Sequence, residues 1–298
     1  MRALLLVNSS ASSVTARGKV VIQKALSADH QVAVAETNRR NHAMRLAQGA
    51  AREGYDVVVA LGGDGTLNEA ANGLAGTSTA LAALPGGSTN VFARTIGLPN
   101  DPIEATGALL DGLAADKIEE VGLGSVNGRY FLFHVGIGFD AAVVEQVERR
   151  AQLKRWAGHP LFVFAAFTTW FRHYERDEPR FTVAGTPAYF SIVLNTNPYT
   201  YLGNRPLDLV PEATLDRGLA AVTFKTLGLL PLVRAVGSAL AGSDIRRLKW
   251  LDVRTDQDSL LVESDRPFPY QVDGDFLGEL TRLELRHIPA ALRLVLPG

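Results

Sequence analysis

Three glycines flank a single aspartate in the segment GGDG at 62–65, directly after the apolar run VVVAL at 57–61. That short, β-branched run is typical of a strand buried on both faces. Thr66 is the predicted N-cap of the helix that follows, and Glu69 occupies the capping-box position three residues later. Glycines allow backbone N–H groups to approach a phosphate closely, and a helix N-terminus favours negative charge. The segment therefore predicts a cradle for nucleotide phosphates.

Asp64 distinguishes this loop from better-known phosphate loops. No Gly-Lys-Ser/Thr follows, as it would in a Walker A motif, and the spacing is not the Gly-x-Gly-x-x-Gly of dinucleotide-binding folds. A carboxylate beside phosphates is repelled unless a cation or a transferable proton lies between them. Asp64 therefore predicts Mg²⁺ binding or acid–base chemistry. The alternative is a plain strand-to-helix turn with Asp64 as the turn former.

A second glycine turn, PGG at 85–87, follows the apolar run at 80–84. Ser88, Thr89 and Asn90 then begin a short predicted helix. Hydroxyl and amide groups at a helix start offer hydrogen bonds to phosphate or ribose. Two neighbouring strands that end in such turns form a crevice at their carboxyl ends, which is where open α/β sheets bind ligands.

The two turns together resemble the signature blocks of the diacylglycerol kinase catalytic domain family, the bacterial lipid kinases related to sphingosine and ceramide kinases. GGDGTLNEA at 62–70 is also similar to NAD kinases and phosphofructokinases, whereas PGGSTNVFAR at 85–94 is similar to the Pro-x-Gly-Thr-x-Asn-Asp-Phe-Ala pattern of the lipid kinases. Ser88 replaces the usual Thr, and Val91 replaces the usual Asp. The resemblance implies an ATP- and Mg²⁺-dependent enzyme that transfers the γ-phosphate of ATP to a lipid hydroxyl, with diacylglycerol or a related lipid alcohol as the acceptor.

The first 120 residues alternate predicted strands and helices, which is typical of a parallel, doubly wound, Rossmann-like sheet. The predicted strands are 3–7, 32–35, 57–61 and 80–84, and the predicted helices are 14–26, 42–53 and 101–113. Asn8 and Thr37 follow the first two strands and are expected at the same edge as the glycine turns. Arg17 and Lys19 either reach phosphate oxygens or form a solvated helix start. The resemblance implies that ATP contacts Asn8, Thr37, Gly62, Gly63, Asp64, Gly65, Thr66, Asn68, Gly87, Ser88, Thr89 and Asn90.

The pattern changes after Lys117 to short extended runs separated by turn residues and helical insertions. Such spacing predicts an antiparallel β-sandwich rather than further βαβ units. The expected organisation has two domains, a nucleotide-binding α/β domain at 1–121 and a β-sandwich domain for the lipid substrate at 122–288. The last strand, at 289–298, is a candidate to return to the first domain.

Two segments of the second half resemble other parts of the lipid kinases. GIGFD at 136–140 resembles a Gly-x-Gly-x-Asp segment that faces the interdomain cleft, although a glycine turn capped by Asp140 is an equal alternative. PEATLDRG at 211–218 is similar to a segment whose second Asp helps to hold a structural Mg²⁺ in relatives. Asp216 keeps the first acid, but Arg217 takes the second position, and a fixed cation disfavours Mg²⁺. A salt bridge of Arg217 is a candidate substitute.

The segment QVDGD at 271–275 ends a predicted strand in a turn with two acids. The lipid kinases carry Asp-Gly-Glu here, and one of these carboxylates is the proposed base, so the resemblance gives that role to Asp273 or Asp275. Phosphoryl transfer needs Mg²⁺ on the phosphates, in-line positioning and an acceptor for the hydroxyl proton. Asp64 is expected to supply the metal contact. On the residues alone, this motif is a common hairpin turn.

A basic cluster at 149–155 precedes the apolar run HPLFVFAAFTTWF at 159–171, which is too short to span a bilayer. The stretch 160–171 is either a core helix or a helix at a membrane interface. The net charge of −1 does not favour nucleic-acid binding, and zero cysteines exclude disulfides and thiolate metal sites. We expect a cytoplasmic enzyme that associates peripherally with membranes; homodimerisation stays open.

Two other functions remain in competition with a lipid kinase. An NAD kinase would use a ribose hydroxyl as the acceptor, and the block at 85–94 and the apolar run argue against it. A non-catalytic nucleotide-binding regulatory protein would explain Val91 and Arg217, which depart from the lipid-kinase pattern. ATP turnover separates this last alternative from both kinases.

Overall fold

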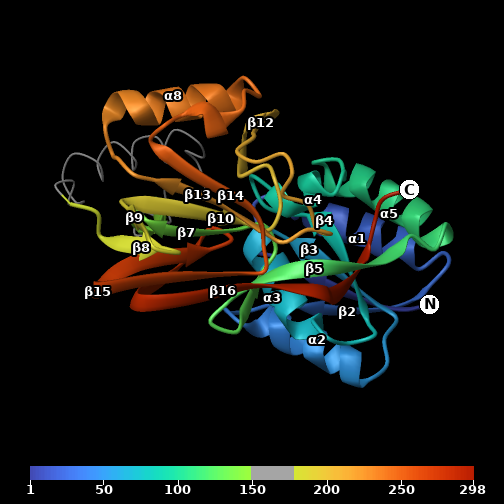
Figure 1. Cartoon of the computed structure of the whole chain (residues 1–298). Coiled ribbons are helices and arrows are strands. Elements are labelled where there is room, and N and C mark those ends of the chain that lie inside the picture. The colour runs from blue at the N-terminus through green and yellow to red at the C-terminus, as the bar shows by residue number, and fades with distance from the viewer. Residues whose placement is uncertain (149–177) are drawn as a thin grey trace. The chain divides into compact units, whose positions relative to one another are not determined.

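The computed structural model describes residues 1–148 and 178–298, which fold into two compact units. Unit 1 comprises Met1–Leu123 and Pro289–Gly298, and unit 2 comprises Gly124–Ile288 (Figure 1). The basic cluster at 149–155 and the apolar run at 160–171 lie outside the described residues, so the choice between a core and an interfacial helix stays a prediction.

Unit 1 is built on a parallel sheet with the strand order β2, β1, β3, β4, β16. Its strands are β1 (Arg2–Val7), β2 (Gln31–Glu36), β3 (Val57–Gly62), β4 (Ala80–Pro85) and the end of β16 (Asp275–Val295). Leu294 of β16 pairs in parallel with Leu81 of β4. Every residue of β3 and β4 is buried, which agrees with the uninterrupted apolar runs expected for parallel strands.

Five helices connect the strands of unit 1. They are α1 (Ala16–Leu26), α2 (His42–Arg52), α3 (Asp64–Leu74), α4 (Val91–Thr95) and α5 (Pro102–Ala114). Helix α1 contacts α5 and α2 contacts α3, and Figure 1 draws these two pairs on opposite faces of the strands. The predicted doubly wound arrangement with parallel N-terminal strands is therefore confirmed.

The predicted cap of α3 is wrong by three residues. The helix begins at Asp64 with Gly63 as its N-cap, so Thr66 already lies inside the first turn. Glu69 does not close a capping box; its carboxylate accepts the N–H groups of Asn41 (2.7 Å) and Ala43 (3.0 Å) at the start of α2. The local spacing predicted that Glu69 caps its own helix, α3. Packing of α2 on α3 instead makes Glu69 a cap for α2.

Unit 2 contains an antiparallel sheet with the strand order β14, β13, β10, β7, β15, β16. Strand β8 also pairs with β15, and β5 pairs with β6 and β16. The elements are β5 (Ile118–Val126), β6 (Arg129–Phe131), β7 (His134–Gly138), α6 (Phe139–Glu148), β8 (Phe181–Val183), β9 (Thr186–Ala188), β10 (Phe190–Leu194), β11 (Thr200–Leu202), β12 (Arg205–Leu207), β13 (Leu219–Phe224), α8 (Leu229–Leu240), the 3₁₀ helix η1 (Ile245–Arg247), β14 (Leu251–Gln257) and β15 (Ser259–Val272). The predicted change to antiparallel strands is confirmed.

The sheet of unit 2 is covered by apolar side chains on both faces. Along β10, Ile192 and Leu194 belong to one apolar cluster, and Val193 between them belongs to another. Successive side chains of a strand point to opposite faces, so the two clusters lie on the two sides of the sheet. Burial on both faces explains why β10 and β13 are apolar without alternation.

The close packing of α2 on α3 can be tested by substitution of a glycine at their contact. A Cβ atom at Gly73 would lie 2.5 Å from the carbonyl oxygen of Met44, whereas one at Gly107 of α5 would meet nothing within 4 Å. Ala normally favours a helix over Gly by about 1 kcal/mol. We expect Gly107→Ala to raise the free energy of unfolding and Gly73→Ala to lower it by about 2 kcal/mol, because the two helices must separate. Urea unfolding measures both, and equal effects would contradict the packing.

Candidate functional site

Three loops of unit 1 follow the carboxyl ends of β1, β3 and β4 and are joined through their backbones. The N–H of Gly86 donates to the carbonyl of Gly62 (2.8 Å), and the N–H of Ser13 donates to the carbonyl of Gly86 (2.9 Å). Asn8 donates from its backbone to Leu61 (2.9 Å). The strand-end loops predicted to share one edge therefore do so.

The glycines of the second turn are required because this turn lies against the backbone of the first. A Cβ atom at Gly86 would lie 2.8 Å from the Cα of Gly62, and one at Gly87 would lie 2.9 Å from the Cα of Gly63. Distances below 3 Å are too short for a real Cβ contact, so larger residues would push the turns apart. The sequence suggested that glycines admit a phosphate; the structure adds that they admit the neighbouring turn.

Asp64 connects the first turn to the second. Its two carboxylate oxygens accept the N–H groups of Val91 and Phe92, each at 3.0 Å, at the first turn of α4. A carboxylate at a helix N-terminus satisfies unpaired donors and is favoured by the helix dipole. Asp64 thus caps α4 while it also stands in the first turn of α3.

Asn68 and Asn90 are buried and engaged in holding the loops. Asn90 has a left-handed backbone, and its side chain bonds both the N–H and the carbonyl of Gly87 at 2.7 and 2.9 Å. Asn68 accepts from Asn72 at 3.2 Å within α3. These bonds explain both residues structurally, and their predicted contact with ATP stays a prediction.

The remaining predicted ATP contacts lie at loop positions with some exposure. The Nδ2 of Asn8 donates to the hydroxyl of Thr66 (3.0 Å), which links the first loop to α3. Thr37 follows β2 and donates its N–H to the carbonyl of Val7 (2.9 Å). Ser88 is exposed, and Gly63, Gly65, Gly87 and Thr89 are half-buried. The backbone groups of these loops are thus held in place by bonds among the loops.

Lys19 lies in α1 rather than in the first loop, and its ammonium pairs with Glu36 at 2.5 Å. Hydrogen bonds from Lys19 and Ser9, together with the charge of Lys19, hold the pKa of the Glu36 carboxyl below its usual value. The charge of Lys19, which was one of the predicted phosphate contacts, is therefore paired with the Glu36 carboxylate. No feature of the local sequence pointed to Glu36 as its partner.

Asp273 of unit 2 is a structural carboxylate. It is buried, its backbone is left-handed with φ 49°, and its oxygens accept three backbone N–H groups. The donors are Leu132 (2.7 Å), Phe133 (3.0 Å) and His134 (3.0 Å). Asp275 begins β16 opposite Val272 and is half-buried. The structure therefore separates the two acids that the sequence left equivalent.

A buried polar cluster lies next to this turn. Asp140 accepts from the hydroxyl of Tyr199 (2.5 Å) and from the Nε2 of Gln271 (2.9 Å), and the Oε1 of Gln271 accepts the N–H of Gly274 (2.8 Å). Burial raises the pKa of the Asp140 carboxyl, although the two hydrogen bonds act to lower it. Burial also raises the pKa of Tyr199. A Cβ atom at Gly136 would lie 1.7 Å from the Asp140 carboxylate, which explains the first glycine of the GIGFD segment. Tyr199 and Gln271 carried no sequence signal.

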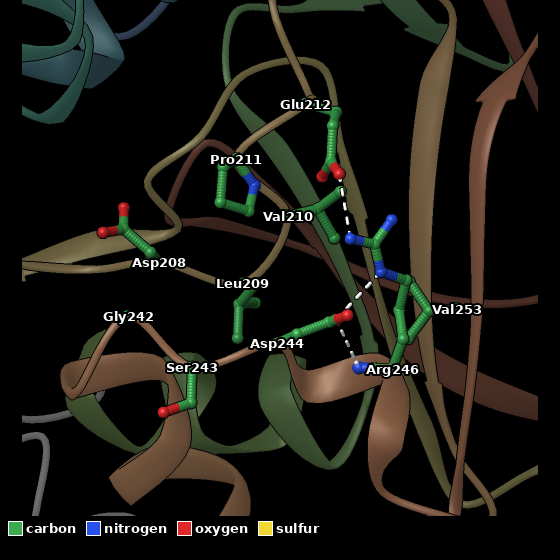
Figure 2. A pocket seen from close by; sticks show the side chains of 10 residues that line it. All are labelled: Asp208, Leu209, Val210, Pro211, Glu212, Gly242, Ser243, Asp244, Arg246 and Val253. Carbon is green, nitrogen blue, oxygen red and sulfur yellow. Dashed lines mark hydrogen bonds and ion pairs between the residues drawn. The ribbon is translucent and has the colours of Figure 1, made fainter.

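The doubtful structural Mg²⁺ site at Asp216 stays a prediction. Asp216 is exposed, and a hydrogen bond from the Thr214 side chain is the main cause that lowers its pKa. No group of three or more His, Asp or Glu side chains suited to a metal occurs in 1–148 or 178–298. The ion pairs here belong to Arg246, which binds Glu212 (2.9 Å) and Asp244 (2.8 Å) beside a small pocket (Figure 2).

Solved structures show the same fold. A crystal structure of a diacylglycerol kinase from Bacillus anthracis superposes with a TM-score of 0.74 at 22% identity, and the match covers 99% of this chain and 96% of that one. Residues 2–126 match the model of the diacylglycerol kinase catalytic domain. The fold and the glycine turns thus define a protein of the diacylglycerol-kinase class.

Curated relatives extend the likeness over the whole chain. A Pseudomonas aeruginosa protein named "Probable lipid kinase YegS-like" is 31% identical over 99% of this chain and 94% of its own length. The diacylglycerol kinase of Bacillus subtilis is 36% identical over 40% of this chain and 39% of its own length. This chain belongs to the diacylglycerol kinase catalytic domain family of lipid kinases. Among the described helices, none is long and apolar enough to cross a membrane.

His134 makes the stability of unit 2 sensitive to acid. Burial lowers the pKa of its imidazole to about 3, whereas an unfolded histidine titrates near 6.5. Below about pH 6.5 this histidine is therefore protonated in the unfolded state but stays neutral in the native state. We expect this residue to remove roughly 1.4 kcal/mol of stability per pH unit between pH 6 and 4.

The measurement is urea unfolding from pH 7 to pH 4 of the parent and of His134→Phe, which keeps an aromatic ring beside Tyr199. Other groups titrate in both proteins, so only the difference between the two slopes reports on His134. The variant should show the shallower loss of stability. Parallel curves would contradict a neutral, buried imidazole.

Proposed function

We propose that this protein is a kinase that transfers the γ-phosphate of ATP to the hydroxyl of a lipid alcohol, with diacylglycerol or a close relative as the acceptor. Membership of the family supports lipid kinase chemistry. The observation that carries the proposal is the backbone-to-backbone contact of the two glycine turns at the ends of β3 and β4, with the N-terminus of α3 behind the first turn. Such a loop before a helix suits phosphate groups.

The proposed ATP site uses the loops that follow β1, β2, β3 and β4. Backbone N–H groups at 62–66 would contact phosphates, while Asn8, Thr37, Ser88 and Thr89 would contact phosphate or ribose. Mg²⁺ that arrives with ATP would reduce the charge on the phosphates, and Asp64 is the carboxylate placed to contact it. Because Asp64 also caps α4, it would keep the two turns in register around the nucleotide.

We assign the base to Asp275 rather than to Asp273. The carboxylate of Asp273 is surrounded by three N–H donors, which stabilise its ionised form and occupy its oxygens. Asp275 is half-buried at the position where the lipid kinases carry Glu. It would accept the proton of the lipid hydroxyl as the oxygen attacks, and Asp273 would hold the turn that presents it.

Unit 2 is the proposed lipid-binding domain. Apolar clusters on both faces of its sheet support the expectation of a β-sandwich. Because its proposed acceptor is a lipid, we propose that the enzyme is cytoplasmic and acts at a membrane surface. NAD kinase is disfavoured because the block at 85–94 and the names of the relatives point to lipid acceptors.

Transfer of labelled γ-phosphate from ATP tests the function. The panel of acceptors contains diacylglycerol, sphingosine, ceramide, isoprenoid alcohols and NAD, each with Mg²⁺. We expect label in a lipid, and in diacylglycerol first. Label in NAD alone would assign an NAD kinase, and no label with tight ATP binding would favour a regulatory protein.

Replacing each acid of the turn tests the assignment of the base. Asp275→Asn should lower kcat by about 10²- to 10⁴-fold, because the group that accepts the proton is lost. Asp273→Asn should instead destabilise the fold by about 3 kcal/mol, because the amide cannot accept all three N–H groups. Asp275→Glu, which restores the usual acid of the family, is the matched control and should keep activity. Full activity in Asp275→Asn would refute the assignment.

A further inference from the structure

Helix α8 presents large apolar side chains to solvent. Leu230 is 62% exposed and Val233 is 59% exposed. The exposed apolar residues of this helix are Leu229, Leu230, Val233, Val236 and Leu240. The spacing of 229, 233, 236 and 240 puts these four on one side of the helix, while the small residues Ala235 and Ala239 are buried.

This arrangement reverses the usual pattern, in which a surface helix buries its large residues. Five of the twelve large hydrophobic residues exposed in the described parts of the chain lie on these twelve positions. Single exposed hydrophobic residues are ordinary, but a contiguous group marks a surface that contacts something apolar. Helix α8 contacts β12 and η1, and Figure 1 shows it at the periphery of unit 2.

The chain segment that contains this helix is basic. Residues 225–251 carry the basic side chains Lys225, Arg234, Arg246, Arg247 and Lys249, and Asp244 is their single acid. Arg246 pairs with Asp244 and Glu212, whereas the other four basic residues are exposed. The whole chain has a net charge of −1, so this excess is local.

We propose that α8 and its basic neighbours dock the protein on an anionic lipid bilayer, with the helix lying in the interface. The inference rests on the proposed function in one respect, namely that the acceptor lipid resides in a membrane. A helix of 12 residues is about 18 Å long and cannot span the bilayer, but it can bury one apolar face among the acyl chains. Exposed Lys and Arg then face the anionic headgroups.

A bilayer suits this surface better than a second copy of the chain. A two-fold contact through α8 would bring the basic residues of both copies together, because such a contact uses the same patch on each. Like charges at an interface are repulsive. Anionic headgroups supply both the opposite charge and the apolar layer beneath it.

Sedimentation of the full chain with phosphatidylglycerol and phosphatidylcholine vesicles tests the proposal. We expect binding to phosphatidylglycerol at least tenfold tighter than to phosphatidylcholine, and weaker at high salt. Leu230→Ser with Val233→Ser should lower the affinity about tenfold or more, because apolar area is lost from the bilayer. The matched control is Val20→Ser with Val21→Ser, two exposed residues of α1, which should bind as the parent does.

The basic residues are tested separately. Arg247→Gln and Lys249→Gln should each lower the affinity for phosphatidylglycerol about fivefold and remove part of its salt dependence. Affinity for phosphatidylcholine should not change. Equal affinities of parent and variants for phosphatidylglycerol would show that these basic residues do not contact the headgroups, and this would overturn the proposal.

Other results would also overturn the proposal. They are a parent that ignores phosphatidylglycerol, or a Leu230→Ser, Val233→Ser variant that binds as the parent does. Exposed residues tolerate Ser, so a markedly lower Tm in that variant would show that the face is covered within the protein and would reject the docking surface. A change from dimer to monomer would show that a second copy covers it.

Vesicle binding is measured without ATP, so its outcome is independent of the kinase assay. Loss of binding in the Leu230→Ser, Val233→Ser variant supports docking even if no lipid is phosphorylated in the parent. Conversely, labelled diacylglycerol with unchanged vesicle binding in the variant would keep the kinase and reject α8 as its docking surface. A soluble short-chain diacylglycerol should be phosphorylated equally by parent and variant.

Discussion

The contact between the two glycine turns of unit 1 is the constraint on which the proposed ATP site depends. Gly86 donates to Gly62 at 2.8 Å, and the second turn has no room for a Cβ atom at Gly86 or Gly87 on the side that faces the first turn. The turns can approach this closely because β3 and β4 are adjacent parallel strands that end at the same level. The N–H groups proposed to bind phosphate and the capping carboxylate of Asp64 thus lie beside one backbone contact.

Both units use a carboxylate to fasten one loop to the start of another element. Asp64 accepts two N–H groups at the start of α4, and Asp273 accepts three immediately before β7. A carboxylate offers more acceptor positions than any neutral side chain, so a single residue satisfies several backbone donors. This use explains why an acid in a motif need not be the acid that performs chemistry, and it is the reason that we propose Asp275 rather than Asp273 as the base.

Elements with a strong local signal were predictable from the sequence. Apolar runs identified β1, β3 and β4, and the change from alternating helices and strands to short strands identified the antiparallel half. Boundaries at the motifs were less predictable: Thr66 was expected to cap α3, yet Asp64 begins it.

By itself, the sequence determined the family, the phosphate-type turns and the set of candidate acids, because glycine spacing and short apolar runs are local properties. Only the tertiary structure decided which backbone groups each acid contacts. Tyr199 and Gln271 reach Asp140 across 59 and 131 residues, and Asp273 reaches Leu132 across 141, so no window of sequence contains these pairs. The exposed apolar face of α8 could not be predicted for the same reason: an apolar helix is expected to be buried unless the structure shows which of its faces has no neighbours.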